Sequence, residues 1–128
     1  MIDVPFHPPA DKVVAIDLPP PLSVNATRRV NWAAKPKMDA WKARADAMVY
    51  AVGGVRKIGK LNGKFEVRIC LDDKLCRIDA DNTAKLLIDY CRNLGLVVND
   101  SKKFMRRLVI EWGDAPTGCR LTFREWGA

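Results

Sequence analysis

The chain has 128 residues, of which 48% are hydrophobic and 29% charged, with 22 Lys and Arg against 15 Asp and Glu. This length fits one domain that needs no disulfide or structural metal to stay folded. Its apolar runs are shorter than the roughly 18 residues of a membrane span, and its start does not resemble a signal peptide. Four cysteines without a Cys-x-x-Cys pair favour reduced thiols over a zinc ribbon or a secreted disulfide scaffold. We therefore expect one cytoplasmic domain over 1–128, with a flexible tail at 1–11, no membrane partner and no small-molecule cofactor.

The positive charge is concentrated in the middle of the chain. Residues 1–27 carry one Lys and three Asp (net −2), residues 28–64 carry ten Lys and Arg against two Asp (net +8), and residues 65–128 carry eleven Lys and Arg against ten acids (net +1). A basic segment favours a polyanionic partner, although a basic solvated surface explains the charge equally well. Acids clustered among basic residues in the last half repel phosphate, and they suit an enzyme that holds a divalent cation against it.

Hydrophobic periodicity predicts a strand, a loop, a helix and a second loop in the first half. Alternating apolar residues predict a strand over 13–18, ended by the three prolines that follow. Residues 22–34 have no periodicity and are expected to form an exposed basic loop. A stripe containing Trp41, Ala45, Met48, Val49 and Val52 predicts a helix over 36–52, which two glycines end. Residues 53–64, rich in glycine and lysine, are expected to form a mobile basic loop.

The second half is predicted to alternate strands with one clear helix. Apolar alternation indicates strands over 64–71, 104–112 and 119–126, with a short extended segment at 97–98. The last two strands are expected to form an antiparallel hairpin, because a loop rich in turn residues joins them. A helix is predicted over 82–94, followed by a glycine suited to a left-handed cap. These elements predict an α+β fold with a mixed or antiparallel sheet of about four strands and two main helices packed on it.

Aromatic side chains are mostly assigned to packing. Trp41 lies on the apolar face of the predicted helix and is expected in the core, with base stacking as the alternative; stacking is also considered for Trp32. Trp112 and Trp126 alternate with strand neighbours and are expected to pack. His7, the single histidine, receives no catalytic role.

One constellation of charged residues carries candidate chemistry. Asp79 and Asp81 are two apart just before the predicted helix, so both can point to one side of an extended backbone. Lys85 lies one helical turn after Asp81, and Asp100 lies on a turn that can fold back beside the helix start. Converging carboxylates repel one another, which makes sense when a hard cation sits among them. Mg²⁺ prefers a few carboxylates together with water and phosphate oxygens.

Each of these residues also has a purely structural interpretation. Asp81 is a good helix N-cap, which contributes roughly 1 kcal/mol, and Asp79 can be an ordinary loop acid. Lys85 and Asp89 have the spacing of a surface ion pair on a helix. Asn99–Asp100 has turn composition. Taken singly, each residue is explained by structure alone; the combination favours a metal site.

The segment 77–100 resembles the RusA-type Holliday-junction resolvases, small endodeoxyribonucleases common in phages and prophages. The shared pattern is Arg-x-Asp-x-Asp-Asn-x-x-Lys, then an apolar helix with an internal Asp, a Gly and a closing acidic turn. Those places are filled by Arg77, Asp79, Asp81, Asn82, Lys85, Asp89, Gly95 and Asp100. An N-terminal strand followed by prolines and Asn25 also matches the opening of the family, so the resemblance covers about 12–126.

The resemblance implies a homodimer that binds four-way DNA junctions in recombination and repair. Such an enzyme nicks two opposing strands symmetrically with Mg²⁺, Mn²⁺ being a possible substitute. Carried over by position, Asp79, Asp81 and Asp100 would hold the metal and Lys85 would act at the scissile phosphate. Asn82 would support or cap the site without touching the metal.

Binding to DNA is expected to come from the basic side chains of the loops. These are Arg28, Arg29, Lys57, Lys60, Arg77, Lys102, Lys103, Arg106 and Arg107, each of which can also be a solvated surface charge. The chain departs from the family pattern in two places: Asn99 precedes Asp100 where a doubled acid is common, and residues 26–29 replace aromatic residues. Three other functions stay open: a non-catalytic nucleic-acid-binding module, a phage regulatory protein that contacts an acidic protein, and a nuclease for flaps or forks.

Overall fold

Four strands and three helices are present in the part of the chain that the structure, a computed structural model, describes: residues 12–22, 35–76 and 83–126. In chain order they are β1 (Val13–Leu18), α2 (Lys35–Ala51), α3 (Val55–Ile58), β2 (Phe65–Asp72), α4 (Ala84–Leu94), β3 (Met105–Gly113) and β4 (Cys119–Glu125). The predicted α+β class, the four strands and the two main helices are confirmed, with boundaries that shift by at most two residues.

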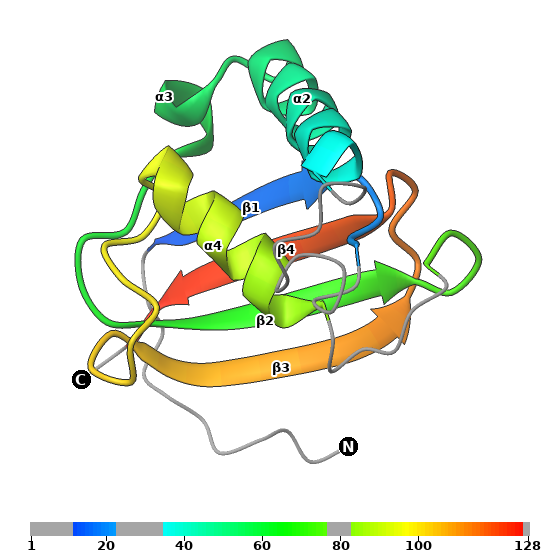
Figure 1. Cartoon of the computed structure of the whole chain (residues 1–128). Coiled ribbons are helices and arrows are strands. Elements are labelled where there is room, and N and C mark those ends of the chain that lie inside the picture. The colour runs from blue at the N-terminus through cyan, green and yellow to red at the C-terminus, as the bar shows by residue number, and fades with distance from the viewer. Residues whose placement is uncertain (1–11, 23–34, 77–82, 127–128) are drawn as a thin grey trace.

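The strands form one mixed sheet in the order β1-β4-β2-β3. β4 pairs antiparallel with both β1 and β2, whereas β2 and β3 are parallel. All three helices lie on the same face of this sheet (Figure 1). Because α4 connects the two parallel strands, its N-terminus follows the carboxyl end of β2, the edge at which open parallel sheets usually place their sites.

The predicted hairpin between the last two strands is wrong. β3 and β4 are not neighbours, because β2 lies between them. β4 is a central strand, paired with β1 on one side and β2 on the other, and its inward side chains Cys119, Leu121 and Phe123 are fully buried. β3 is instead an edge strand with partly exposed side chains. Turn-rich loop composition indicates a reversal of the chain, and it does not indicate which strand becomes the neighbour.

A buried acid holds the connection that crosses from β3 to β4. The Asp72 carboxylate, at the end of β2, accepts hydrogen bonds from the backbone N–H groups of Lys74 (2.9 Å), Leu75 (3.0 Å) and Ala115 (3.0 Å). Asp72 is only 6% exposed, and these backbone donors, Ala115 first, lower its pKa. Asp72 therefore fixes both the turn after β2 and the loop that passes over the end of that strand.

Acid should weaken the contribution of Asp72 to stability. Its pKa is lowered by folding, so its contribution is complete above the ordinary carboxyl pKa of about 4 and is lost as the pH falls through the folded value. Asp72→Asn is expected to be less stable than wild type at about pH 7, and the difference should narrow at about pH 3. Urea unfolding of both proteins at the two pH values measures this difference, and an unchanged difference would contradict the assignment.

The core lies between the sheet and the helices. The strand prediction is confirmed at β2, where Phe65, Val67, Ile69 and Leu71 are at most 1% exposed. The expected mobile loop over 53–64 instead contains the short helix α3. No strand forms at 97–98, where the chain bends with Val97 buried.

The tryptophan predictions are confirmed in part. Trp41 is 4% exposed and belongs to the core, as predicted. Trp112 is 43% exposed, so the prediction that it packs is wrong. Trp112 pairs with Leu71 of β2, but Leu71 lies on a central strand and is fully buried, whereas Trp112 lies near the end of edge strand β3.

Candidate active site

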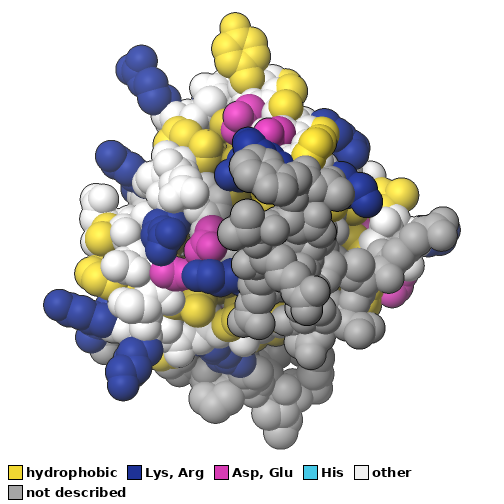
Figure 2. Space-filling model, viewed as in Figure 1, with side chains coloured by type: hydrophobic (Ala, Val, Ile, Leu, Met, Phe, Trp, Pro, Cys, Tyr) yellow, Lys and Arg dark blue, Asp and Glu magenta, His cyan; other side chains and the backbone are white. Residues whose placement is uncertain are grey.

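Four charged residues meet on α4 and the segment that follows it. The Lys85 Nζ atom lies 3.2 Å from Asp89 Oδ1 and 3.7 Å from Asp100 Oδ2. The Arg92 guanidinium lies 3.1 Å from Asp100 Oδ1 and 3.7 Å from Asp89 Oδ1. We call Lys85, Asp89, Arg92 and Asp100 the α4 cluster. Figure 2 shows acidic and basic side chains together on the helix-bearing face.

Helical spacing produces one half of this cluster. Residues four and seven apart project from the same side of a helix, so Lys85, Asp89 and Arg92 form one polar stripe. Leu87 and Cys91 occupy the opposite side and are fully buried against the sheet. The apolar face therefore fixes the rotation of α4 and keeps the charged stripe toward solvent.

The end of α4 brings Asp100 to that stripe. Gly95 adopts a left-handed conformation (φ 87°), and its N–H bonds to the carbonyls of Arg92 and Cys91. Leu96 is fully buried and its carbonyl accepts a hydrogen bond from Leu61 N–H at 2.7 Å. The chain is thus anchored immediately after the helix, and Asp100 returns beside α4, as the sequence predicted for this turn.

Opposite charges balance within the cluster. Asp100 is its most enclosed side chain at 18% exposure, whereas Lys85 is the most open at 64%. Exposed ion pairs contribute little, about 0–1 kcal/mol each. Among the described residues Asp100 contacts Lys85 and Arg92, while the repulsion expected from Asp79 and Asp81 stays a prediction. Removing its charge should therefore cost the protein these two contacts.

The structural interpretations of two residues are also present. Lys85 and Asp89 form the helical ion pair that their spacing predicts. Asn99 Oδ1 accepts a hydrogen bond from Ser101 N–H at 3.1 Å, as in an Asx turn. Helix α4 begins at Ala84 with Thr83 as its N-cap, slightly later than predicted.

The other predicted site residues lie outside the described part of the chain. These are Asp79, Asp81 and Asn82 of the proposed metal site, and Arg28, Arg29 and Arg77 of the proposed DNA surface. The convergence of Asp79 and Asp81 with Asp100 therefore stays a prediction.

The chemistry of the cluster is compatible with a hard cation. Across 12–22, 35–76 and 83–126, no three His, Cys, Asp or Glu side chains gather closely enough to hold a metal ion. Asp89 and Asp100 nevertheless contact the same Lys85 amine, so their carboxylates face a common point. Carboxylate oxygens are the donors that Mg²⁺ prefers. The Asp100 carboxylate has the donor chemistry of one such ligand, and its role as a metal ligand together with Asp79 and Asp81 stays a prediction.

The predicted DNA-contacting residues that the structure describes form two groups at opposite edges of the sheet. Lys102, Lys103 and Arg106 follow Asp100 directly and are exposed at the start of edge strand β3. Arg107 is half-buried and lies 3.9 Å from Glu66, which offsets its charge. Lys57 and Lys60 are exposed in and after α3, which packs against the other edge strand, β1.

Two interactions seen in the structure were not predicted from the sequence. Arg92 was not among the predicted site residues, and its contact with Asp100 depends on the path of the chain after Gly95. The three backbone hydrogen bonds accepted by Asp72 were also not predicted, because the sequence shows only an acid at the end of a strand.

Two comparisons with known sequences give no match. No protein-family model matches the chain, and no curated protein matches its sequence. Among the described residues, none of the helices has the length and apolar character needed to cross a bilayer.

Proposed function

We propose that this chain is a Mg²⁺-dependent endodeoxyribonuclease that resolves four-way DNA junctions by paired symmetric nicks. The main support is the approach of Asp100 to Lys85, which lie fifteen positions apart in the sequence and 3.7 Å apart in space. Both residues belong to the motif by which the chain resembles RusA-type resolvases. The fold therefore brings together the two described members of the proposed catalytic set.

The proposal gives the charged residues separate roles. Asp79, Asp81 and Asp100 would hold Mg²⁺, with Mn²⁺ as a substitute, and a bound ion would neutralise phosphate charge and activate water. Arg92 contacts the Asp100 carboxylate at 3.1 Å and would keep it in place. Lys85 is the more exposed of the two cations, so it is the one able to turn toward the scissile phosphate, where developing negative charge would be stabilised.

A two-fold dimer would match the substrate. A four-way junction presents two equivalent strands, and an isologous pair of subunits presents two equivalent sites. Lys102, Lys103 and Arg106, next to Asp100, would contact the backbone close to the cut. This part of the proposal rests on the charge distribution and on the resemblance.

Junction affinity should fall steeply with salt. If four to six basic side chains contact phosphate, the slope of log affinity against log salt concentration is expected to be about −4 to −5. Fluorescence anisotropy with a labelled four-way junction, in EDTA to prevent cleavage, measures the slope. Lys103→Ala should reduce its magnitude by about one, whereas a flat response would exclude a phosphate-binding surface.

The decisive experiment compares substrates and metals. Labelled four-way junction, linear duplex and flap DNA are incubated with the protein in Mg²⁺ or in EDTA. Symmetric nicks in the junction alone, and in Mg²⁺ alone, are expected. Cleavage of flaps or forks instead would retain the nuclease and change its substrate.

A non-catalytic nucleic-acid-binding module is the second candidate. It is favoured by the charge balance of the α4 cluster, in which both acids have basic partners among the described residues. This alternative predicts junction binding that is indifferent to Mg²⁺ and no nicks under any condition. The same assay therefore distinguishes the two candidates.

A further inference from the structure

The outer edge of β1 has backbone groups available for another strand. β1 is at the end of the strand order and pairs only with β4 among the described strands. In an antiparallel pair, every second residue of an edge strand forms hydrogen bonds with the neighbouring strand. Glu125 N–H donates to the Lys12 carbonyl at 3.1 Å, so Lys12 is one of the residues that bond to β4. Val14, Ile16 and Leu18 consequently bond to β4. The N–H and C=O groups of Val13, Ala15 and Asp17 point away from the sheet.

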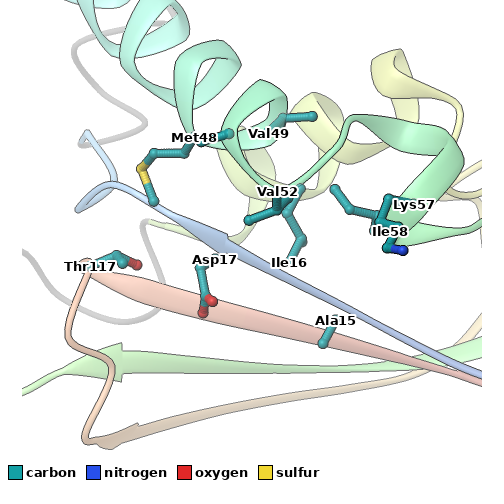
Figure 3. Close-up of a pocket in the computed structure, with 10 residues that line it drawn as sticks. Ala15, Ile16, Asp17, Met48, Val49, Val52, Lys57, Ile58 and Thr117 are labelled. Carbon is teal, nitrogen blue, oxygen red and sulfur yellow. The ribbon is translucent and has the colours of Figure 1, made fainter.

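A cavity of about 400 Å³ opens at this edge. Its apolar walls are formed by Ile16 of β1, Met48 and Val49 of α2, Val52 directly after α2, and Ile58 of α3. Ala15, Asp17 and Lys57 also line it (Figure 3). Since Ala15 and Asp17 are two of the residues whose backbone faces outward, the cavity gives access to both hydrogen-bonding groups and apolar surface.

Among the described residues, β1 itself carries few of the features that usually protect an edge strand. Proteins commonly block such an edge with free charges, prolines or a bulge. Here Asp17 is engaged by Arg120, at 2.7 and 3.1 Å, and Val13 is 48% exposed. Val52, predicted in the apolar stripe of α2, is 57% exposed at the cavity instead of buried. Strand-addition sites combine these features: a free edge beside a pocket for a side chain.

The charge around the cavity favours an acidic occupant. Lys57 has no ion-pair partner in the described ranges, and Arg56 and Lys60 beside it are also exposed. The stretch 35–64 that supplies α2 and α3 carries eight Lys and Arg against two Asp. In a two-fold contact between copies of this chain, that basic surface would face itself. A partner with carboxylates avoids this repulsion.

We propose that this edge binds an extended acidic segment of a partner protein as a fifth strand next to β1. The backbone of the segment would bond to Ala15 and Asp17, one apolar side chain would enter the cavity, and a carboxylate would reach Lys57. This site lies at the opposite sheet edge from β3 and shares only Lys57 with the predicted DNA contacts, so it does not depend on nuclease activity.

A peptide of seven residues in which leucine alternates with glutamate is the direct probe. Labelled with fluorescein, it should bind the full chain saturably in an anisotropy titration. Hydrogen exchange should show slower exchange of the Ala15 and Asp17 amides in the complex, because these N–H groups gain partners. The same peptide with lysine in place of glutamate should bind at least about tenfold more weakly.

Ala15→Pro isolates the backbone contribution. Proline removes an N–H that the β1–β4 ladder does not use, and edge strands tolerate it there. Peptide affinity should fall by about tenfold, the effect of one lost hydrogen bond. Lys57→Glu should also weaken binding, whereas Lys42→Glu, an exposed change on α2, should not. A peptide N-methylated at alternate amides tests the same bonds in the wild-type protein, should Ala15→Pro fail to fold.

Two results would overturn the proposal. One is equal affinity for the acidic and basic peptides, or binding without protection of Ala15 and Asp17. The other is a wild-type dimer in sedimentation that becomes monomeric in Ala15→Pro, because the edge would then pair with a second copy.

Discussion

Replacement of Asp100 by Asn should abolish metal-dependent cleavage of a four-way junction and leave junction binding intact. Asparagine keeps the size of the side chain and removes the negative charge that a hard cation needs from its ligand. Cleavage is expected to fall by at least about a hundredfold, while affinity in EDTA should not fall, because one negative charge near the phosphates is lost. Single-turnover cleavage and anisotropy on the same junction measure the two effects, and Asp79→Asn is expected to behave alike.

Asp89→Asn is the matched control within the α4 cluster. Asp89 contacts the same two cations as Asp100, at 3.2 Å from Lys85 and 3.7 Å from Arg92. Unlike Asp100, it is not one of the proposed metal ligands. Its replacement should retain cleavage within about tenfold, since a half-exposed ion pair contributes only about 0–1 kcal/mol. If cleavage fell equally in Asp89→Asn and Asp100→Asn, the α4 cluster would contribute through its ion pairs alone and Asp100 would not be a metal ligand.

Folding stability separates a catalytic role of Asp100 from a structural one. The contacts of Asp100 with Arg92 and Lys85 make the Asn variant slightly less stable, by at most about 1 kcal/mol in urea unfolding. If Asp100→Asn lost binding, cleavage and several kcal/mol of stability together, the acid would be structural and the nuclease proposal would fail.

Local patterns in the sequence predicted the elements, because each element depends on its own periodicity. Alternation around Phe65 and Ile69 specified β2, and the helical spacing of Leu87 and Cys91 specified α4. The order of strands did not follow from such patterns. β4 lies between β1 and β2 and pairs with both, and this pairing joins segments that are far apart in the chain.

In the candidate site, too, local spacing was predictable and contacts between distant segments were not. The stripe of Lys85, Asp89 and Arg92 follows from helix geometry alone, so the sequence was sufficient. The approach of Asp100 was predicted from the turn, but its pairing with Arg92 depends on how Gly95 and Leu96 redirect the chain. Hence the sequence predicted that Asp100 returns to the helix but not that Arg92 contacts it.

Trp41→Ala should cause the largest loss of stability of any substitution considered, about 3–5 kcal/mol in the free energy of unfolding. Trp41 is 4% exposed, and its ring meets the Tyr90 ring edge-on with centroids 5.3 Å apart. Its Nε1–H donates to the Pro20 carbonyl at 2.9 Å, which ties α2 to the segment after β1. Alanine would leave a cavity between α2 and α4 and an unpaired carbonyl. Urea unfolding followed by circular dichroism measures the loss.

Trp41→Phe distinguishes packing from a role in DNA binding. Phenylalanine keeps an aromatic ring against Tyr90, whose hydroxyl donates to Asp46 Oδ1 at 2.6 Å, and it removes only the hydrogen bond to Pro20. Stability should fall by about 1–2 kcal/mol, and junction affinity should stay at the wild-type value because Trp41 is not accessible to bases. Had Trp41 stacked on an opened junction, affinity would fall in Trp41→Ala under conditions where the protein is still folded, which is the result that would contradict its place in the core.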